Sequence, residues 1–377
     1  MAQDINARLN RLKIRRRGMD RLGRLNETAR AEILNDSVTD ERWQKRANNQ
    51  PNTRYVLGSM QEVGTEYTRI SVETAERVGK QLKNGLMSAG YSVEFRLQGS
   101  VPLNVHIRGV SDVDLLNLEA GYHTYDRGGL RDLIGSYTSP DARNSVSVLW
   151  PLRKKSEEIL ISKFPAATVD TSGGKAIAIS GGSLARPVDV VPSHWHDTFN
   201  YQRSGDERDR GIVLLDKKIP ETIQNLSFLH IDRVNKQDTA CNGGLKKAIR
   251  LCKNVKNDAV EEGKTIKFPS FDIAATMYHA DRLALQAGHI YELAILAETQ
   301  RFLDELYHDP VKAKSLYVPD GSKKIFDSNE KYDGLRTLSC EMDKLLKEVA
   351  KEQGTQLTGQ DVLISHGRER LRKAYIL

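Results

Sequence analysis

Two aspartates one residue apart, in the stretch DVDLLNLE at 112–119, are the clearest chemical signal in the chain. In a β-strand, residues i and i+2 point to the same face, so Asp112 and Asp114 present their carboxylates together while Val113 and Leu115 face the core. Two carboxylates this close repel each other, and the repulsion raises the pKa of one of them unless a cation neutralises the pair. Paired oxygen ligands suit Mg²⁺ that is held together with substrate phosphates. The pair therefore predicts half of a cation site.

A third carboxylate is expected from the stretch RPVDVVP, in which apolar residues flank Asp189 on a short strand at 185–193. Three such carboxylates can hold two cations, one that activates an attacking oxygen and one that steadies a leaving pyrophosphate. Asp170 is the competitor for the third position. It stands beside Ser-Gly-Gly, where turn chemistry explains it. The histidines of PSHWHD, His194 and His196, lack further metal ligands and are interpreted as structural.

A phosphate-binding turn is predicted just before the paired aspartates. Tyr91, Val93, Phe95 and Leu97 alternate with polar residues, which indicates a half-buried strand that ends at Gly99-Ser100. A glycine lets the backbone approach a ligand closely, and the N–H groups here, with the Ser100 hydroxyl, can bind phosphate oxygens.

The surrounding pattern predicts a mixed α/β half followed by an α-helical half. A long amphipathic helix is expected from Ser59 to about Met87, and helical patterns dominate beyond about Asp216. Between them we expect a mostly helical stretch at about 127–163 and a hairpin across 169–180. The expected units are a basic N-terminal helical segment at 1–54, a catalytic core with its long entry helix at 55–215, and a helical domain at 216–377.

The composition argues against a membrane protein and against a fold that depends on disulfides or zinc. The chain has 377 residues, of which 39% are hydrophobic and 28% charged, and it contains no apolar run long enough for a membrane span. Nothing in it reads as a secretory signal, so a cytoplasmic location is expected. The three cysteines lack CxxC spacing and predict neither a disulfide framework nor a zinc site.

The net charge of +7 is concentrated in the first 50 residues, which hold twelve Lys and Arg against seven Asp and Glu. The stretch RLKIRRRGMDRLGR could contact phosphates of a nucleic acid, but no aromatic residues interleave with it as stacking platforms. We therefore expect a solvated helix face or a basic arm with another purpose, and no nucleic-acid activator.

LQGSVPLNVHIRGVSDVDLL followed by RPVDVVP resembles the DNA polymerase beta-like nucleotidyltransferase superfamily. LKKAIRLCKNVK and FPSFDIAATMYHA resemble the helical half of oligoadenylate synthase, cyclic GMP-AMP synthase and the bacterial CD-NTases of anti-phage (CBASS-type) signalling. The resemblance implies an α+β fold in two lobes, a mixed-sheet nucleotidyltransferase core with flanking helices and a helical domain, with the active site in the cleft between them.

The resemblance also implies roles for individual residues. It gives metal binding to the three aspartates Asp112, Asp114 and Asp189, with Asp189 helping to deprotonate a ribose hydroxyl, and phosphate binding to Gly99 and Ser100. Lys253 matches a helix lysine that holds the donor triphosphate, with Arg250 as a second contact. Ser270-Phe271 matches a Ser-Tyr pair whose ring stacks on the donor base, although Phe lacks the hydroxyl. The alternatives are an ordinary basic helix face for Lys253 and Arg250, and a core position for Phe271.

The expected function is synthesis of a cyclic di- or trinucleotide second messenger from nucleoside triphosphates, with release of pyrophosphate. The expected cofactor is Mg²⁺, as two ions, with Mn²⁺ as a substitute. Expected partners are ATP and other NTPs, an effector protein that the product activates, and a regulatory protein. Two alternatives stay open: a template-independent nucleotidyltransferase that modifies RNA or protein, and a non-catalytic nucleotide-binding protein.

Overall fold

The structure, a computed structural model, describes residues 4–16, 27, 31, 41–109, 111–138, 141–354 and 363–377. Its strands are β1 Val93–Gln98, β2 Val113–Tyr125, β3 Thr168–Asp170, β4 Ile177–Gly181, β5 Leu184–Asp197, β6 Gly211–Asp216 and β7 Glu221–Asn225. Its helices are α1 Ile5–Arg16, α3 Pro51–Met60, α4 Thr65–Ser88, α5 Leu130–Leu133, α6 Ser145–Lys163, α7 Phe199–Ser204, α8 Ser227–Ala240, α9 Gly244–Glu261, α10 Ser270–Met277, α11 Arg282–Ala287, α12 Leu293–His308, α13 Pro310–Ser315, α14 Asn329–Glu352 and α15 Ile364–Leu371, with short 3-10 turns at Arg42–Lys45 and Glu207–Asp209.

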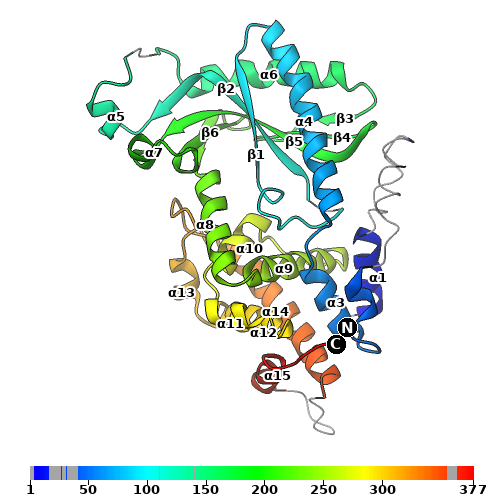
Figure 1. Cartoon of the computed structure of the whole chain (residues 1–377). Coiled ribbons are helices and arrows are strands. Elements are labelled where there is room, and N and C mark those ends of the chain that lie inside the picture. Colours follow the sequence, from blue (N-terminus) through cyan, green and yellow to red (C-terminus); the bar gives the residue numbers. More distant parts are fainter. Residues whose placement is uncertain are drawn as a thin grey trace.

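The strands of the described chain form one mixed sheet in the order β1-β2-β5-β4-β3. β2 and β5 run parallel in its centre, and β6 pairs with the second half of β5 and with β7. Helices α4 and α6 contact the central strands, and the α-helical half lies on the other side of the sheet, joined to it by α8 (Figure 1). The predicted arrangement of a mixed sheet with flanking helices beside a helical half is confirmed.

The central strands divide their side chains between two apolar clusters. Val113 and Leu115 of β2 and Val188 and Val190 of β5 are buried against α4 and α6, as the alternation predicts. Farther along the strands, Leu116 and Leu118 of β2 belong to a smaller apolar cluster on the opposite face, against which Phe228 of α8 packs. Strands buried on both faces read as nearly continuous apolar runs, and LLNL and VDVV are of this kind.

The long entry helix is broken, contrary to the prediction of one helix from Ser59. α3 ends at Met60 and α4 begins at Thr65, because the chain passes here from the helical half to the sheet. At the break, carbonyl groups lack a hydrogen-bond donor within the helix, and buried arginine side chains donate to them instead. Arg250 donates to the Met60 carbonyl at 2.8 Å, and Arg16 donates to the Glu62 carbonyl at 2.8 Å.

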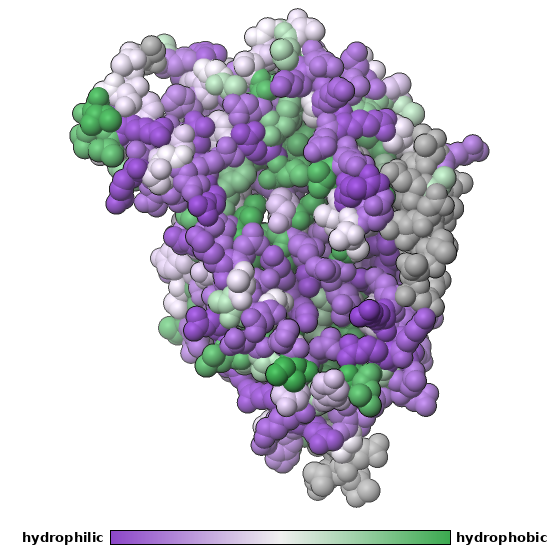
Figure 2. Space-filling model, in the orientation of Figure 1, coloured by the Kyte–Doolittle hydropathy of each residue, from purple (hydrophilic) through white to green (hydrophobic). Residues whose placement is uncertain are grey.

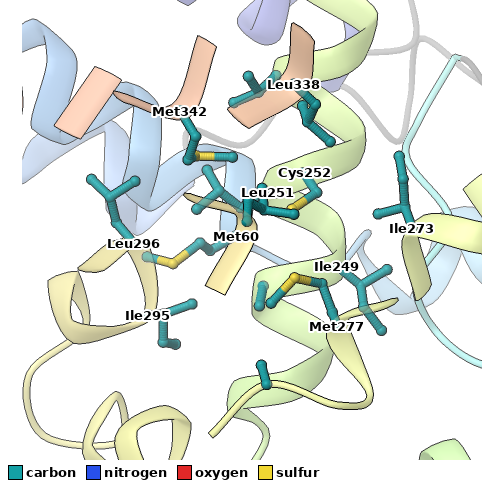
Figure 3. Packing of buried hydrophobic residues seen from close by; sticks show 14 of the residues in the cluster. Met60, Ile249, Leu251, Cys252, Ile273, Met277, Ile295, Leu296, Leu338 and Met342 are labelled. Atoms are coloured by element: carbon teal, nitrogen blue, oxygen red, sulfur yellow. The ribbon is translucent and has the colours of Figure 1, made fainter. Parts of the chain in front are cut away.

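The helical half has its own core, with α9 in the middle. Met60 of α3 lies among side chains of α9, α12 and α14, close to Leu251, Leu296 and Met342 (Figure 3). All four side chains are fully buried. Since α3 precedes the sheet in sequence and α9 follows it, the two ends of the chain build this core together.

Several elements differ from the sequence predictions in extent. β2 and β5 are longer than the expected strands. The helical pattern SFDIAATMYHADRLAL at 270–285, within the predicted helical half, forms two helices, α10 and α11, because Asp281 caps a new helix by accepting the Ala284 N–H. The stretch at 127–163 is helical only in α5 and α6 among its described residues. β6, β7 and α8 were not predicted as separate elements. The domain limits 1–54, 55–215 and 216–377 stay a prediction, although the sheet continues to Asn225.

The basic residues of α1 face acidic residues of the helical half. Arg15 donates to both carboxylate oxygens of Asp258 on α9, at 2.8 and 3.0 Å, and Arg8 bridges Glu262 and Glu341. Both arginine side chains are buried. This part of the basic stretch therefore attaches α1 to the protein, while Arg17 and the rest of that stretch lie outside the described residues. In the described chain, no helix is long and apolar enough to span a membrane.

The α1 contact gives a stability prediction. Arg15→Gln leaves Asp258 as a buried carboxylate with one cation fewer, which should lower the free energy of unfolding by about 3 kcal/mol. Lys13→Gln is the matched control on the same helix, because Lys13 forms no ion pair with the described residues. Urea unfolding followed by circular dichroism measures both. Equal stability of Arg15→Gln and the parent would contradict a structural role for this arginine.

Candidate active site

The three predicted carboxylates lie together at the central strands β2 and β5, in a pocket that the helical half also lines. Asp112 immediately precedes β2, Asp114 is the second residue of β2, and Asp189 is in β5. Parallel pairing of these strands places Asp114 directly opposite Asp189. All three line one pocket of about 420 Å³, and the surface is hollowed where the two halves meet (Figure 2).

Burial and neighbouring negative charge raise the pKa values of two of these aspartates. Burial raises the pKa of Asp114 to about 7, and the nearby Asp189 and Asp112 add to this effect, while Lys253 opposes it. Burial likewise raises the pKa of Asp189 to about 6, with a contribution from Asp112. Such mutual repulsion in a partly dehydrated cleft is what a bound cation relieves.

The turn after β1 packs directly against this cluster. Gly99 has a φ of +77°, and a Cβ atom at this position would lie 2.0 Å from Oδ2 of Asp114. Only glycine therefore allows the backbone to pass beside the carboxylate. Gly99 and Ser100 both line the pocket, so the predicted phosphate turn and the aspartates share one site.

Lys253 reaches the pocket from α9. Its side chain is only 4% exposed, and its ammonium group donates to the Val105 carbonyl at 2.7 Å. Burial lowers its pKa to about 7, with Asp114 opposing the shift. These features exclude the alternative of a solvated basic helix face.

Arg250, by contrast, does not line this pocket. Its guanidinium group donates to the carbonyls of Met60 and Asn104, at 2.8 and 2.6 Å. It therefore connects α9 with the end of α3 and with the loop between β1 and β2. A solvated helix face is excluded for this residue too, because only 5% of it is exposed.

Ser270 and Phe271, at the start of α10, line the pocket from the helical half. Phe271 is 41% exposed, which excludes the alternative of a core residue. Its ring stacks on His230 of α8, with the ring centroids 4.6 Å apart. The Lys323 ammonium lies over the same ring, 5.3 Å from its centroid, so this aromatic side chain already has two neighbours in the pocket.

Among the pocket residues that sequence reasoning missed, three have titratable side chains: His230, Asp320 and Lys323. His230 belongs to a helix that was not predicted as a separate element. Asp320 lies in the tetrapeptide PDGS, which is a strong turn signal that conceals any other role. No local pattern could have found them, because they meet the aspartates only through the packing of the two halves.

The residues that were judged structural have local partners. His194 contacts Ser145 Oγ and the Trp195 carbonyl, both at 2.8 Å, and His196 contacts Thr124 and Asp126. Asp170 accepts a hydrogen bond from the Ser172 N–H, as in a turn. None of the three lines the pocket that the carboxylates share.

The side chains of the pocket include oxygen ligands that suit a metal ion. In the part of the chain that the structure describes, no three His, Cys, Asp or Glu side chains converge into a ready-made cluster. The three aspartates nevertheless supply the hard oxygen ligands that Mg²⁺ and similar ions prefer, and the raised pKa values of Asp114 and Asp189 mark a deficit of positive charge between them. The residues therefore fit a cation that binds together with the phosphates of a nucleotide.

A mixed sheet that carries three carboxylates beside a glycine turn, capped by a helical half, defines a nucleotidyltransferase. Residues 232–347 match the family model of the cGAS/DncV-like nucleotidyltransferase C-terminal helical domain. The chain is 41% identical over 358 residues to the cyclic dinucleotide synthase CdnE of Yersinia aleksiciae, covering 92% of each chain. It is 33% identical over 247 residues to a c-di-GMP synthase of a Lachnospiraceae bacterium, covering 60% of this chain and 68% of that one.

A solved structure is similar to this chain over nearly its whole length. The STING-associated CdnE c-di-GMP synthase of Capnocytophaga granulosa superposes with a TM-score of 0.69 at 27% identity, covering 94% of this chain and 100% of that chain. The chain belongs to the cGAS/DncV-like nucleotidyltransferases, the CD-NTases. It is a metal-dependent nucleotidyltransferase that synthesises a cyclic oligonucleotide from nucleoside triphosphates.

The carboxylate cluster predicts a pH dependence of stability without metal. Because the folded pKa values of Asp114 and Asp189 are raised above 3.8, these two carboxyl groups bind more protons in the folded state than in the unfolded state between about pH 4 and pH 7. Their contribution to the free energy of unfolding should therefore fall as the pH rises through this window. Urea unfolding in EDTA at about pH 5 and about pH 8 should show that the free energy of unfolding of the parent falls relative to that of Asp114→Asn/Asp189→Asn, because the buried histidines that titrate in the same range are common to both proteins. An identical change with pH in both proteins would contradict the shifts.

Proposed function

We propose that the chain makes a cyclic dinucleotide in anti-phage (CBASS-type) signalling, and that the pocket between its two halves is the place of synthesis. The observation that carries the proposal is the register of β2 and β5, which aligns Asp114 with Asp189 beside Gly99. Two of the relatives described above are named as c-di-GMP synthases and one as a cyclic dinucleotide synthase.

The proposed metal ligands are Asp112, Asp114 and Asp189, and the proposed ion is Mg²⁺, as two ions, with Mn²⁺ as a substitute. Bound ions would neutralise the phosphates, lower the pKa of the attacking hydroxyl and stabilise the leaving pyrophosphate. Asp189 accepts the proton of the ribose hydroxyl, a role that its position opposite Asp114 in the register of β2 and β5 supports. The hydroxyl then attacks the α-phosphate in line, and a P–O bond forms as pyrophosphate leaves.

The other pocket residues bind and orient the nucleotides. The N–H groups at Gly99 and Ser100 bind phosphate oxygens, and Lys253 exchanges its bond with the Val105 carbonyl for a triphosphate oxygen. Phe271 stacks on a base, with Ser270 beside it. Arg250 acts as a positioning residue through the Asn104 carbonyl. The remaining proposed partners are ATP or other NTPs as substrates, an effector protein that the product activates, and a regulatory protein.

The proposal is tested with the double variant Asp112→Asn/Asp114→Asn. This change removes two negative charges and keeps side-chain size, so turnover should fall by about three orders of magnitude or more while the protein stays folded. The parent and the variant are incubated with labelled NTPs and Mg²⁺, treated with phosphatase, and the resistant product is identified by mass spectrometry. Asp170→Asn, the exposed turn residue, is the control and should retain activity. A double variant that makes the same product at the parental rate would refute the metal assignment.

Lys253→Ala provides a second test. Loss of a charged hydrogen bond to the triphosphate should raise the KM for NTP by about tenfold or more. Lys247→Ala, on the same helix but outside the pocket, should leave KM unchanged. Melting temperatures of both variants separate binding from folding, because Lys253 also bonds to the Val105 carbonyl. An unchanged KM for Lys253→Ala would remove this residue from nucleotide binding.

A further inference from the structure

A polar groove of about 750 Å³ lies between α1 and the turn at 47–50 that precedes α3. The helices α1 and α3 pack side by side here (Figure 1). The groove shares no residue with the carboxylate pocket. Among the described residues, its lining contains five amide side chains, two cations and no acidic group, in addition to Leu9 and Pro51: Asn6, Asn10, Asn48, Asn49, Gln50, Lys13 and Arg54. The groove therefore combines positive charge with many hydrogen-bonding groups.

Lys13 differs from the other cations of α1. Arg8, Arg11 and Arg15 all form ion pairs with acidic residues of the helical half. Lys13 has neither an ion pair nor a hydrogen bond with any described residue, although it is only partly exposed. Glu352 accepts the first N–H groups of α3 and does not line the groove. The Lys13 ammonium is thus a cation of the groove that the described chain does not neutralise.

Arg54 presents unused donors from the side of α3. Its Nε donates to the Arg46 carbonyl at 3.0 Å, and its Nη2 donates to the Ala47 carbonyl at 3.2 Å and to Oδ1 of Asn48 at 3.3 Å. These bonds fix the guanidinium group against the turn. A guanidinium group carries five N–H donors, so the two on Nη1 keep no acceptor among the described residues.

The turn at 47–50 adds backbone donors to the groove. It is closed by the Gln50 N–H, which donates to the Ala47 carbonyl at 3.1 Å, whereas the N–H groups of Asn48 and Asn49 donate to no acceptor in the described chain. Ala47 and Asn49 have φ values of +53° and +60°. This left-handed conformation is unfavourable for alanine, and such residues cluster at ligand sites. Free N–H groups in a turn of this kind form a concavity that suits an anion.

The unused groups of the groove favour a phosphate over other anions. Nearly all of them are donors, and phosphate offers more acceptor oxygens and more negative charge than a carboxylate does. A guanidinium group can bind two phosphate oxygens at once, and an ammonium group binds phosphate as a point charge. The groove is larger than a phosphate ion. Its remaining amides, such as Asn6 and Asn10, can donate to and accept from hydroxyl groups of an attached organic part.

We propose that the groove between α1 and the turn at 47–50 is a binding site for a phosphate-bearing small molecule. Lys13 and Nη1 of Arg54 bind the phosphate oxygens, together with the free N–H groups of the turn. The bound ligand connects α1 to the turn before α3 and so adds to the ion pairs that attach α1 to the helical half. This site is separate from the pocket of the three aspartates, and the inference does not depend on the proposed function.

The test measures binding of three probes to the full chain by calorimetry in EDTA: inorganic phosphate, ribose 5-phosphate and ribose. The parent should bind both phosphates and not ribose, and the affinity should fall as the salt concentration rises. Tighter binding of ribose 5-phosphate than of phosphate would assign the site to phosphate esters, and equal binding would assign it to the free ion. Either result supports the site. Absence of binding of both phosphates would overturn it.

Two variants locate the binding in the groove. Lys13→Gln removes the unpaired cation and should weaken the affinity for both phosphates by about tenfold, since it removes a charged hydrogen bond. Asn10→Asp keeps every cation, places a carboxylate in the groove, and should weaken both phosphates by repulsion. Lys45→Gln is the matched control, because Lys45 is exposed near the turn and lies outside the groove. This variant should bind as the parent does.

Thermal melts provide an independent measurement of the same site. A ligand that binds the folded state raises the melting temperature, so ribose 5-phosphate should raise that of the parent and of Lys45→Gln more than that of Lys13→Gln. The melts without ligand also verify that each variant folds. Folded Lys13→Gln and Asn10→Asp variants that bind both phosphates as tightly as the parent would place the binding elsewhere, and the proposed site would be wrong.

Discussion

The parallel pairing of β2 with β5 is the constraint on which the rest of the structure depends. It places Asp114 opposite Asp189 on two central strands whose other face packs apolar residues against α4 and α6. Two carboxylates in this position repel each other, and the fold tolerates them because the packing of Val113, Leu115, Val188 and Val190 against α4 and α6 holds the strands in register. A shift of the strand register by one residue would move the carboxylates to the face that packs against the apolar core. Burying them there would cost far more free energy than their mutual repulsion.

The helical half directs two buried cationic side chains of α9 toward the sheet. α9 carries Lys253 toward the carboxylates and Arg250 toward the backbone at the break between α3 and α4. The same helix holds Asp258, to which Arg15 of α1 is paired. The N-terminal helix is thus connected through α9 to the pocket, and a basic segment that looks like a nucleic-acid contact in the sequence supports the fold in its described part.

The pocket depends on both halves and on neither alone. The sheet supplies the carboxylates and the glycine turn, and the helical half supplies Lys253, Phe271 and the polar side chains beside it. Ser227, at the start of α8, donates a hydrogen bond to Gln98 at the end of β1, so the two halves are joined at the pocket itself. A ligand that bridges the halves would therefore contact groups that are already held in place.

The sequence by itself determined which polar residues accompany the first strands of the sheet. Alternation and local motif predicted β1, the shared face of Asp112 and Asp114, the strand around Asp189 and the glycine turn, because period-two burial and turn geometry are local properties. Only the tertiary structure decided where α3 ends, since Met60 must reach a core built mainly from residues two hundred positions later. It also decided that Arg250 supports a loop instead of lining the pocket, and that Asp320, in an ordinary turn tetrapeptide, faces His230. These contacts join residues far apart in the chain, and no pattern along the sequence records such distances.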